Sequence, residues 1–132
     1  MLCPVCDVEM LVLEFELVEI DYCDECRGVW LDSGELELVG ERTGALAGKL
    51  EAALREQEGR QPAAHRPCPV CRKGMVEVTT PGEPPIVLDR CRHGLWFDHG
   101  ELGAVVRTAG ADEDNLLARF FAELGGARDD NT

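Results

Sequence analysis

Seven cysteines hold most of the chemistry available to this chain, and their spacing is regular. Cys3-x2-Cys6 is followed, after sixteen residues, by Cys23-x2-Cys26. This is the spacing of a two-knuckle zinc site, in which each pair gives two thiolates and the segment between folds one pair onto the other. Four sulfurs satisfy tetrahedral Zn²⁺ and leave no open position. These residues therefore predict a structural zinc ion.

A second set has one sulfur fewer. Cys68-x2-Cys71 is followed, after nineteen residues, by Cys91 alone. His93 is the expected fourth ligand, because it stands where Cys26 stands once the extra residue before Gly28 is dropped. It lies one residue closer to Cys91 than a CxxC or CxxH knuckle requires, and a longer imidazole can cover that gap.

Two alternatives remain for this ligand. His99, six residues further on, is the first, and water or another donor is the second. His65 is interpreted as a solvated loop residue. With His93 as the ligand, seven cysteines and one histidine complete two closed sites for two Zn²⁺ ions, with no thiol left over.

The two cysteine sets belong to two copies of one unit. CPVC recurs at an offset of 65, and the segment Gly-x-Trp-x-Asp-x-Gly-Glu-Leu recurs at an offset of 66. The predicted organisation is a first zinc ribbon, a helix, a linker, a second ribbon, a C-terminal helical segment and a flexible tail. Their expected ranges are 1–38, 39–58, 59–66, 67–103, 104–125 and 126–132.

Alternation of apolar and polar residues predicts a hairpin in each ribbon. In the first, the phase changes at Leu17-Val18, which indicates two short strands joined by a tight turn or bulge. In the second, MVEVTT and IVLDR flank the turn-rich PGEPP. Trp30 and Trp96 are expected to cap the knuckles and pack on the hairpins. Asp32 and Asp98 are expected to cap the helices that follow.

One helix is expected over residues 33–56, weakened by three glycines. Another is expected over residues 112–124, with one strongly apolar face. That face, offered as a binding surface, comprises Leu116, Leu117, Phe120, Phe121 and Leu124. The predicted fold class is therefore a small, metal-stabilised α+β protein, because units of this size bury too little apolar surface to fold without a staple.

Composition and charge limit the classes of function that this chain can have. The formal net charge is -13, and residues 1–58 carry 15 acids against 4 bases. Such a field repels nucleic acid, so only the middle section could touch phosphate, through Arg72, Lys73, Arg90 and Arg92. No apolar run approaches the roughly 18 residues of a membrane span. The start of the chain does not resemble a secretory signal, so a reducing cytoplasm is the expected compartment.

The two repeats resemble the bacterial zinc-ribbon family named after the transcription factor IIB zinc finger. The resemblance rests on CPVC with CDECRGVWLDSGEL in the first copy, and on CPVC with CRHGLWFDHGEL in the second. It covers roughly 70 of the 132 residues. It implies zinc binding in a small ribbon and, by analogy, a nucleic-acid or transcription-related role.

Three functions remain in view. The first is a protein-interaction, adaptor or regulatory module that binds a protein partner or another copy of itself through apolar helix faces. The second is nucleic-acid binding through the second ribbon. The third is zinc handling or thiol redox chemistry at the CxxC pairs. No enzymatic activity and no small-molecule substrate are expected, because closed sites have no position for an activated water.

Overall fold

The structure is a computed structural model that describes residues 1–43, 45–55, 62–81, 85–108 and 116–124. In parts of the helices and of β4 only the backbone is described. The first half contains β1 (Leu11–Phe15), β2 (Val18–Tyr22), β3 (Val29–Asp32), α1 (Ser33–Thr43) and α2 (Ala45–Arg55). The second half contains β4 (Pro62–Pro67), β5 (Gly74–Thr79), β6 (Val87–Cys91), β7 (Gly94–Phe97), α3 (Glu101–Thr108) and α4 (Leu116–Leu124). This is the small α+β fold that the sequence predicts.

The two ribbons share one antiparallel sheet. Its seven strands in the described part of the chain run in the order β1-β2-β3-β7-β6-β5-β4. The ribbons meet where β3 pairs with β7, and in that ladder Trp30 lies opposite Trp96. Because these two residues are equivalent in the repeats, the ladder relates the two copies by a local twofold axis, like an isologous dimer interface within one chain.

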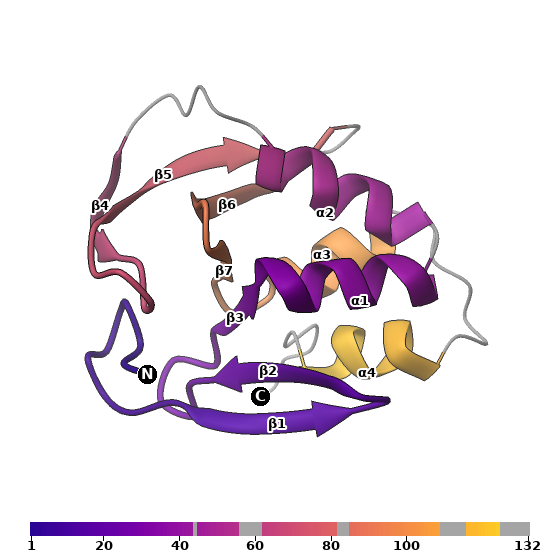
Figure 1. Cartoon of the computed structure of the whole chain (residues 1–132), viewed down its shortest axis with the longest axis horizontal. Coiled ribbons are helices and arrows are strands. Elements are labelled where there is room, and N and C mark those ends of the chain that lie inside the picture. The colour runs from indigo at the N-terminus through magenta and orange to yellow at the C-terminus, as the bar shows by residue number, and fades with distance from the viewer. Residues whose placement is uncertain (44, 56–61, 82–84, 109–115, 125–132) are drawn as a thin grey trace.

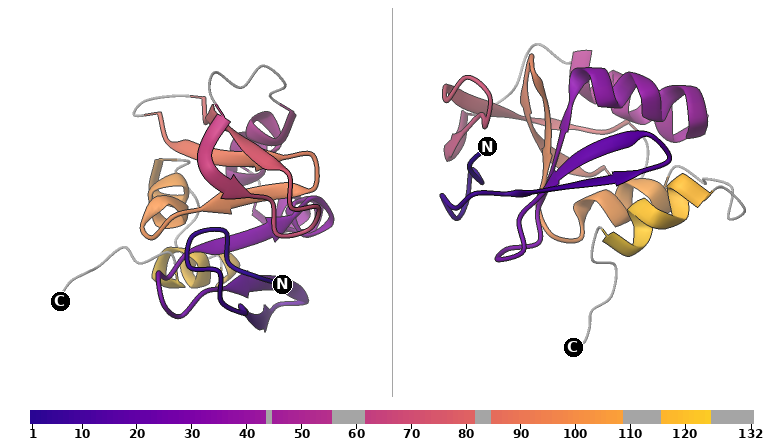
Figure 2. Two further views of the ribbon diagram at one scale, coloured as in Figure 1. Left: turned by 90° about the vertical axis from the view of Figure 1, so that its left-hand side faces the viewer. Right: turned by 60° about the horizontal axis from the view of Figure 1, so that its bottom comes forward.

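The sheet separates two apolar clusters, and the helices gather on one side of the molecule (Figure 1). Alternate residues of β3 and β7 point to opposite faces. Leu31 and Leu95 are buried in the larger cluster, with residues of α1, α2, α3 and α4. Trp30 and Trp96 lie in the smaller cluster with cysteines of both sets. Figure 2 shows the same division, with the helices on one side of the sheet and the N-terminal knuckle on the other.

The tight turn predicted in the first ribbon is present. Phe15 pairs with Val18, so Glu16 and Leu17 form a two-residue hairpin turn between β1 and β2. Both have left-handed backbones, with φ of 54° and 70°. A two-residue turn with positive φ at both positions matches the twist of its strands but favours Asn and Gly. This turn therefore places two unfavourable residue types in a strained conformation.

The linker predicted over residues 59–66 is wrong for its described part. Residues 62–67 form β4, which pairs with β5 at the end of the sheet. Proline donates no backbone hydrogen bond and is tolerated in a sheet on an edge strand. Pro62 and Pro67 thus fit β4, although their presence in the sequence indicates a linker.

The single helix predicted over residues 33–56 is also wrong, because the chain folds back between α1 and α2 (Figure 1). Glycines lower helix propensity by roughly 1 kcal/mol each. A fold-back lets both short helices bury an apolar side chain, and Leu36, Val39 and Leu50 are all inaccessible to solvent. The hairpin of β5 and β6 agrees with the prediction.

The apolar face predicted on the C-terminal helix packs within its own chain. Phe121 is fully buried, and Phe120 stacks on Phe15 with ring centroids 4.6 Å apart. Leu124 also packs against the larger cluster. Phe120, Phe121 and Leu124 are therefore not a free binding surface, because they pack within the chain's own core. The side chains of Leu116 and Leu117 lie outside the described residues.

Among the described helices, none combines the length and hydropathy that crossing a membrane would require.

Candidate metal centres

The first cysteine set converges as its spacing predicts. The sulfurs of Cys3, Cys6, Cys23 and Cys26 all lie within 4.8 Å of one another. The Cys3 and Cys26 sulfurs are 3.7 Å apart. Four thiolates around Zn²⁺ at about 2.3 Å would place neighbouring sulfurs about 3.8 Å apart. The donor set and its dimensions therefore fit a structural zinc ion.

A repeated backbone turn forms the knuckles. After the second cysteine of three knuckles stands a residue with a left-handed backbone: Asp7, Arg27 and Arg72, with φ of 60°, 65° and 69°. The amide of each donates to the carbonyl of the first cysteine, over 2.7 to 2.9 Å. In the first knuckle the amides of Val5 and Cys6 also donate to the Cys3 sulfur, each over 3.3 Å. This turn directs both sulfurs of a CxxC pair to one side.

The fourth knuckle is built differently. Cys91 pairs with Gly94 in the ladder between β6 and β7, so Arg92 and His93 form a two-residue hairpin turn. His93 Nδ1 lies 3.4 Å from the Cys91 sulfur and 4.0 Å from that of Cys68. The imidazole thus covers the distance lost with the missing residue.

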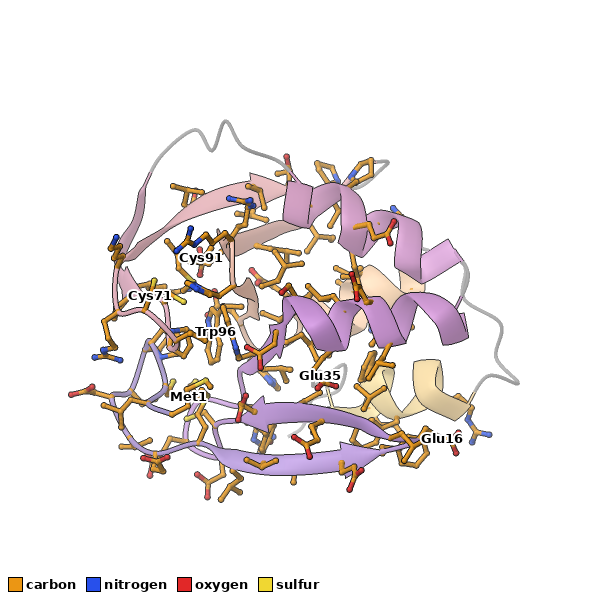
Figure 3. The ribbon with its side chains drawn as sticks, viewed as in Figure 1. Met1, Glu16, Glu35, Cys71, Cys91 and Trp96 are labelled. Carbon is orange, nitrogen blue, oxygen red and sulfur yellow. The ribbon has the colours of Figure 1, made fainter. Side chains whose placement is uncertain are left out.

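The second site is completed by this histidine. Cys68, Cys71, Cys91 and His93 form one group of ligand atoms within 4.8 Å of one another. Figure 3 shows Cys71 and Cys91 side by side at the end of the molecule away from the helices, with their sulfurs 3.7 Å apart. His99 is exposed and lies outside the groups found among the described residues. The side chain of His65 falls outside the described part of the chain.

Burial raises the pKa of a cysteine thiol, whereas hydrogen bonds from backbone amides lower it, and the two effects oppose each other at these sites. Burial raises the pKa of Cys68 to about 12. Burial would also raise the pKa of Cys23, but the amides of Cys26 and Glu25 lower it below its usual value. The amide of Lys73 lowers the pKa of Cys71. Thiolates this close repel one another, so a cation must be bound for the whole set to ionise.

The tryptophans hold the two sites together. Trp30 and Trp96 are fully buried among Cys3, Cys23 and Cys68, which confirms that they pack on the knuckles. Each ring lies against the glycine of the other copy. A Cβ atom added to Gly28 would stand 2.2 Å from Cζ2 of Trp96. A Cβ atom added to Gly94 would stand 2.9 Å from Cζ2 of Trp30 and 2.2 Å from the carbonyl oxygen of Leu31. The tryptophan of each ribbon thus packs against the glycine of the other ribbon, and both contacts require glycine.

The aspartate of each Trp-x-Asp pair fixes the indole. Trp30 Nε1 donates to Asp32 over 2.7 Å, and Trp96 Nε1 donates to Asp98 over 3.1 Å. The backbone amide of Asp98 also donates to Glu101 over 2.9 Å, which is half of the predicted capping box. In the first copy Glu35 accepts instead from the amide of Glu19.

Arg66 is a structural residue that sequence reasoning missed. Its guanidinium donates to Asp89 over 2.9 Å and to Asp98 over 2.6 Å, tying β4 to the second Trp-x-Asp pair. Burial raises the pKa of Asp89, although Arg66 opposes the shift. Burial also raises the pKa of Glu101, to about 7. The one signal in the sequence that could have indicated a structural role for Arg66 is its positive charge next to Pro67.

The four basic residues of the second ribbon do not all act together. Lys73, Arg90 and Arg92 line one cavity together with Cys71 and Cys91. Arg72 instead lies 3.9 Å from Asp7 of the first ribbon, in an exposed ion pair. Such a pair contributes little to stability.

Comparison with known proteins agrees with this geometry. Residues 2–42 match the family model described as Transcription factor zinc-finger, a zinc ribbon of the TFIIB type. The first ribbon is therefore of this class, and the chain carries a second cluster that fits a second ribbon. The second assignment rests on the repeat and on its own ligands. No curated protein and no solved structure gave a significant match.

Proposed function

We propose that this chain is a protein-interaction module whose two structural zinc ions hold a rigid sheet with one edge open to a partner. Four protein ligands close each site, so a catalytic role for the metal has no open coordination position. The family description supports a transcription-related setting. A reducing cytoplasm suits the seven free thiols.

The sheet has two edge strands among the described residues, β1 and β4, and the proposal rests on β1. It pairs with β2 on one side and, within the described residues, with no strand on the other. Val12 in this strand is 64% exposed and Leu17 at the hairpin tip is 70% exposed. An edge strand with exposed apolar side chains is a template for a further strand. It therefore suits a partner segment in extended conformation.

Leu17 supports a binding role because the fold does not account for it. It contacts solvent more than any other large hydrophobic residue in the described structure, and its backbone is left-handed. Glycine would relieve the turn, whereas leucine keeps the strain. Glu16, labelled in Figure 3, stands beside it at the tip. We infer that Leu17 is present for its side chain.

The charge around this edge indicates the partner. Glu14 and Glu19 are exposed and lie opposite each other on β1 and β2. Residues 1–58 carry 15 acids against 4 bases. A second copy of such a surface would be repelled, so the proposed occupant is a basic, extended segment of another protein.

The test uses zinc-loaded protein as bait in its own cell extract, with quantitative mass spectrometry of what is retained. Leu17→Gly and Val12→Lys should lose the specifically bound proteins at least tenfold. Val87→Lys is the matched control, because Val87 is also an exposed strand valine, at 44%, but lies away from the β1 edge. Leu17→Gly should also raise the free energy of unfolding, by about 1 kcal/mol, because it removes backbone strain.

A gain in stability together with a loss of binding separates recognition from misfolding. Equal retention by all three variants and the wild type would contradict the proposal. A dimer seen by sedimentation velocity and abolished by Val12→Lys would instead make the partner a second copy of this chain.

Nucleic-acid binding is a second candidate, and the cavity lined by Lys73, Arg90 and Arg92 favours it. It requires an affinity for DNA or RNA whose logarithm falls linearly with the logarithm of salt concentration. Reversing the charge of Lys73 or Arg92 should weaken that binding and reduce the salt dependence. Failure to bind single- and double-stranded DNA and RNA at low salt would exclude it.

A further inference from the structure

A cavity of about 330 Å³ opens beside the second metal site. Lys73 follows one knuckle of this site and Arg92 belongs to the other; both line the cavity, together with Arg90 near the end of β6. Gly74 and Val76 also line it, as do Cys71 and Cys91, two ligands of the second metal site. Three cations thus gather around one hollow, in a chain whose net charge is -13. A concentration of one charge in a concave site is a feature of ligand binding.

The first ribbon shows whether this fold needs the three cations, because the equivalent positions there hold other residues. In the aligned repeats Val8 stands where Lys73 stands, and Tyr22 stands where Arg90 stands. The acidic pair Asp24 and Glu25 occupies the position of Arg92, and Arg27 is the cation of that knuckle. The same scaffold therefore forms without the three cations of the second ribbon.

The metal centres do not explain the difference. A zinc ion with four thiolates has a formal charge of -2, and one with three thiolates and a neutral histidine has a charge of -1. If these cations served to neutralise the thiolates, the first site would need them more. It is instead flanked by acids.

Gly74 borders the cavity at a point where there is open space. An added Cβ atom there would have no heavy atom within 4 Å. Its counterpart in the first ribbon is Glu9, which stands at the same place in the same bridge: Leu2 pairs with Glu9 as Pro67 pairs with Gly74. Glu9 is held there by the N-terminal ammonium group. The second ribbon thus lacks a carboxylate where the first ribbon has one.

We propose that this cavity, bounded by Lys73, Gly74, Arg90 and Arg92, is a binding site for a compact phosphate group. Phosphate is recognised by convergent Arg and Lys side chains through charge-assisted hydrogen bonds. The cavity has room for a phosphate with a small substituent. The acidic surroundings disfavour a long polyanion, because its flanking phosphates would meet the charge of the first half of the chain.

The test is an amide NMR titration of the zinc-loaded full chain with inorganic phosphate, at constant ionic strength. Adenosine monophosphate and a phosphoserine peptide are parallel arms that distinguish a metabolite from a modified protein as the source of the group. Saturable shifts are expected at Lys73, Gly74 and Arg92. The equivalent amides of Val8 and Asp24 in the first ribbon should stay in place.

Gly74→Glu is the decisive variant, because it places the residue of the first ribbon at the equivalent position of the second. It should weaken phosphate binding at least tenfold while both zinc ions are retained. Gly74→Ala is its control and should bind normally, since a Cβ atom meets nothing there. Arg92→Gln should weaken binding about tenfold, whereas Arg27→Gln in the first ribbon should leave it unchanged.

Several results would overturn the proposal. One is the absence of saturable shifts at tens of millimolar phosphate. Another is an equal response to chloride, or an equal response of the first ribbon, since either would mean general screening. Unweakened binding by Gly74→Glu would place the phosphate elsewhere. Affinity that grows with the length of an oligonucleotide would replace the compact ligand with nucleic acid.

Discussion

The reciprocal packing of the tryptophans makes Gly28 the most informative position to change. Replacing it with alanine adds one methyl group, and its Cβ atom would lie 2.2 Å from Cζ2 and 2.5 Å from Cη2 of Trp96. Ordinary contact between carbon atoms needs about 3.5 Å or more. The gap between the 2.2 Å approach and an ordinary contact means that the ring would have to move by more than about 1 Å. Trp96 is fully buried, so there is no free space for that movement.

The energetic consequence follows from where the ring lies. Trp96 contacts the cysteine cluster on one side and is fixed by Asp98 on its indole nitrogen. Its backbone pairs with that of Trp30 in the only ladder joining the two ribbons within the described residues. Overpacking a close-packed core costs about 1–3 kcal/mol, and here it also strains that ladder. We expect Gly28→Ala to lower the free energy of unfolding by about 3 kcal/mol.

The assay is chemical denaturation of the zinc-loaded protein, followed by tryptophan fluorescence and circular dichroism. Gly48→Ala is the matched control, since Gly48 lies within α2 and an added Cβ atom there meets nothing within 4 Å. It should stabilise the protein by about 0.5–1 kcal/mol through helix propensity. A Gly28→Ala protein within about 0.5 kcal/mol of the wild type would refute the reciprocal packing.

Three further changes address the ligands and the buried charges. His93→Ala should reduce the zinc content by one ion per chain in elemental analysis, whereas His99→Ala should leave it unchanged. Glu101→Gln should stabilise the fold above pH 7 and have no effect near pH 4. Burial raises the pKa of Glu101 in the folded state to about 7, above its value in the unfolded chain. The ionised carboxylate therefore destabilises the folded state increasingly as the pH rises from the unfolded pKa to the folded one. Denaturation at several pH values measures this, and a stability difference independent of pH would contradict it. Arg66→Met should destabilise the protein by about 3 kcal/mol at pH 8 and less at pH 5, where Asp89, left without its cation, can take up a proton.

The metal ligands were the most predictable part of the molecule. Spacing alone identifies Cys3, Cys6, Cys23 and Cys26, because a knuckle is a local structure formed by a few consecutive residues. His93 required the alignment of the two copies, since Cys91 and His93 do not form a standard knuckle. The hairpins followed from alternation for the same local reason.

Contacts between distant segments were not accessible in the same way. The repeat indicates two ribbons, but nothing local shows that β3 and β7 pair or that each tryptophan packs on the other copy. Tertiary context also reversed two interpretations. The proline-rich segment before Cys68 joined the sheet as an edge strand, and Phe121 filled the core instead of a partner's surface.

Zinc stoichiometry measured together with unfolding tests the central claim most directly. Metal coordination should be what stabilises each ribbon, because the smaller apolar cluster consists of two tryptophans, two methionines and the cysteines themselves. We expect two Zn²⁺ ions per purified chain, and removal of both by a chelator should abolish the cooperative thermal transition. A metal-free protein that keeps its cooperative melting and compact dimensions would contradict this account.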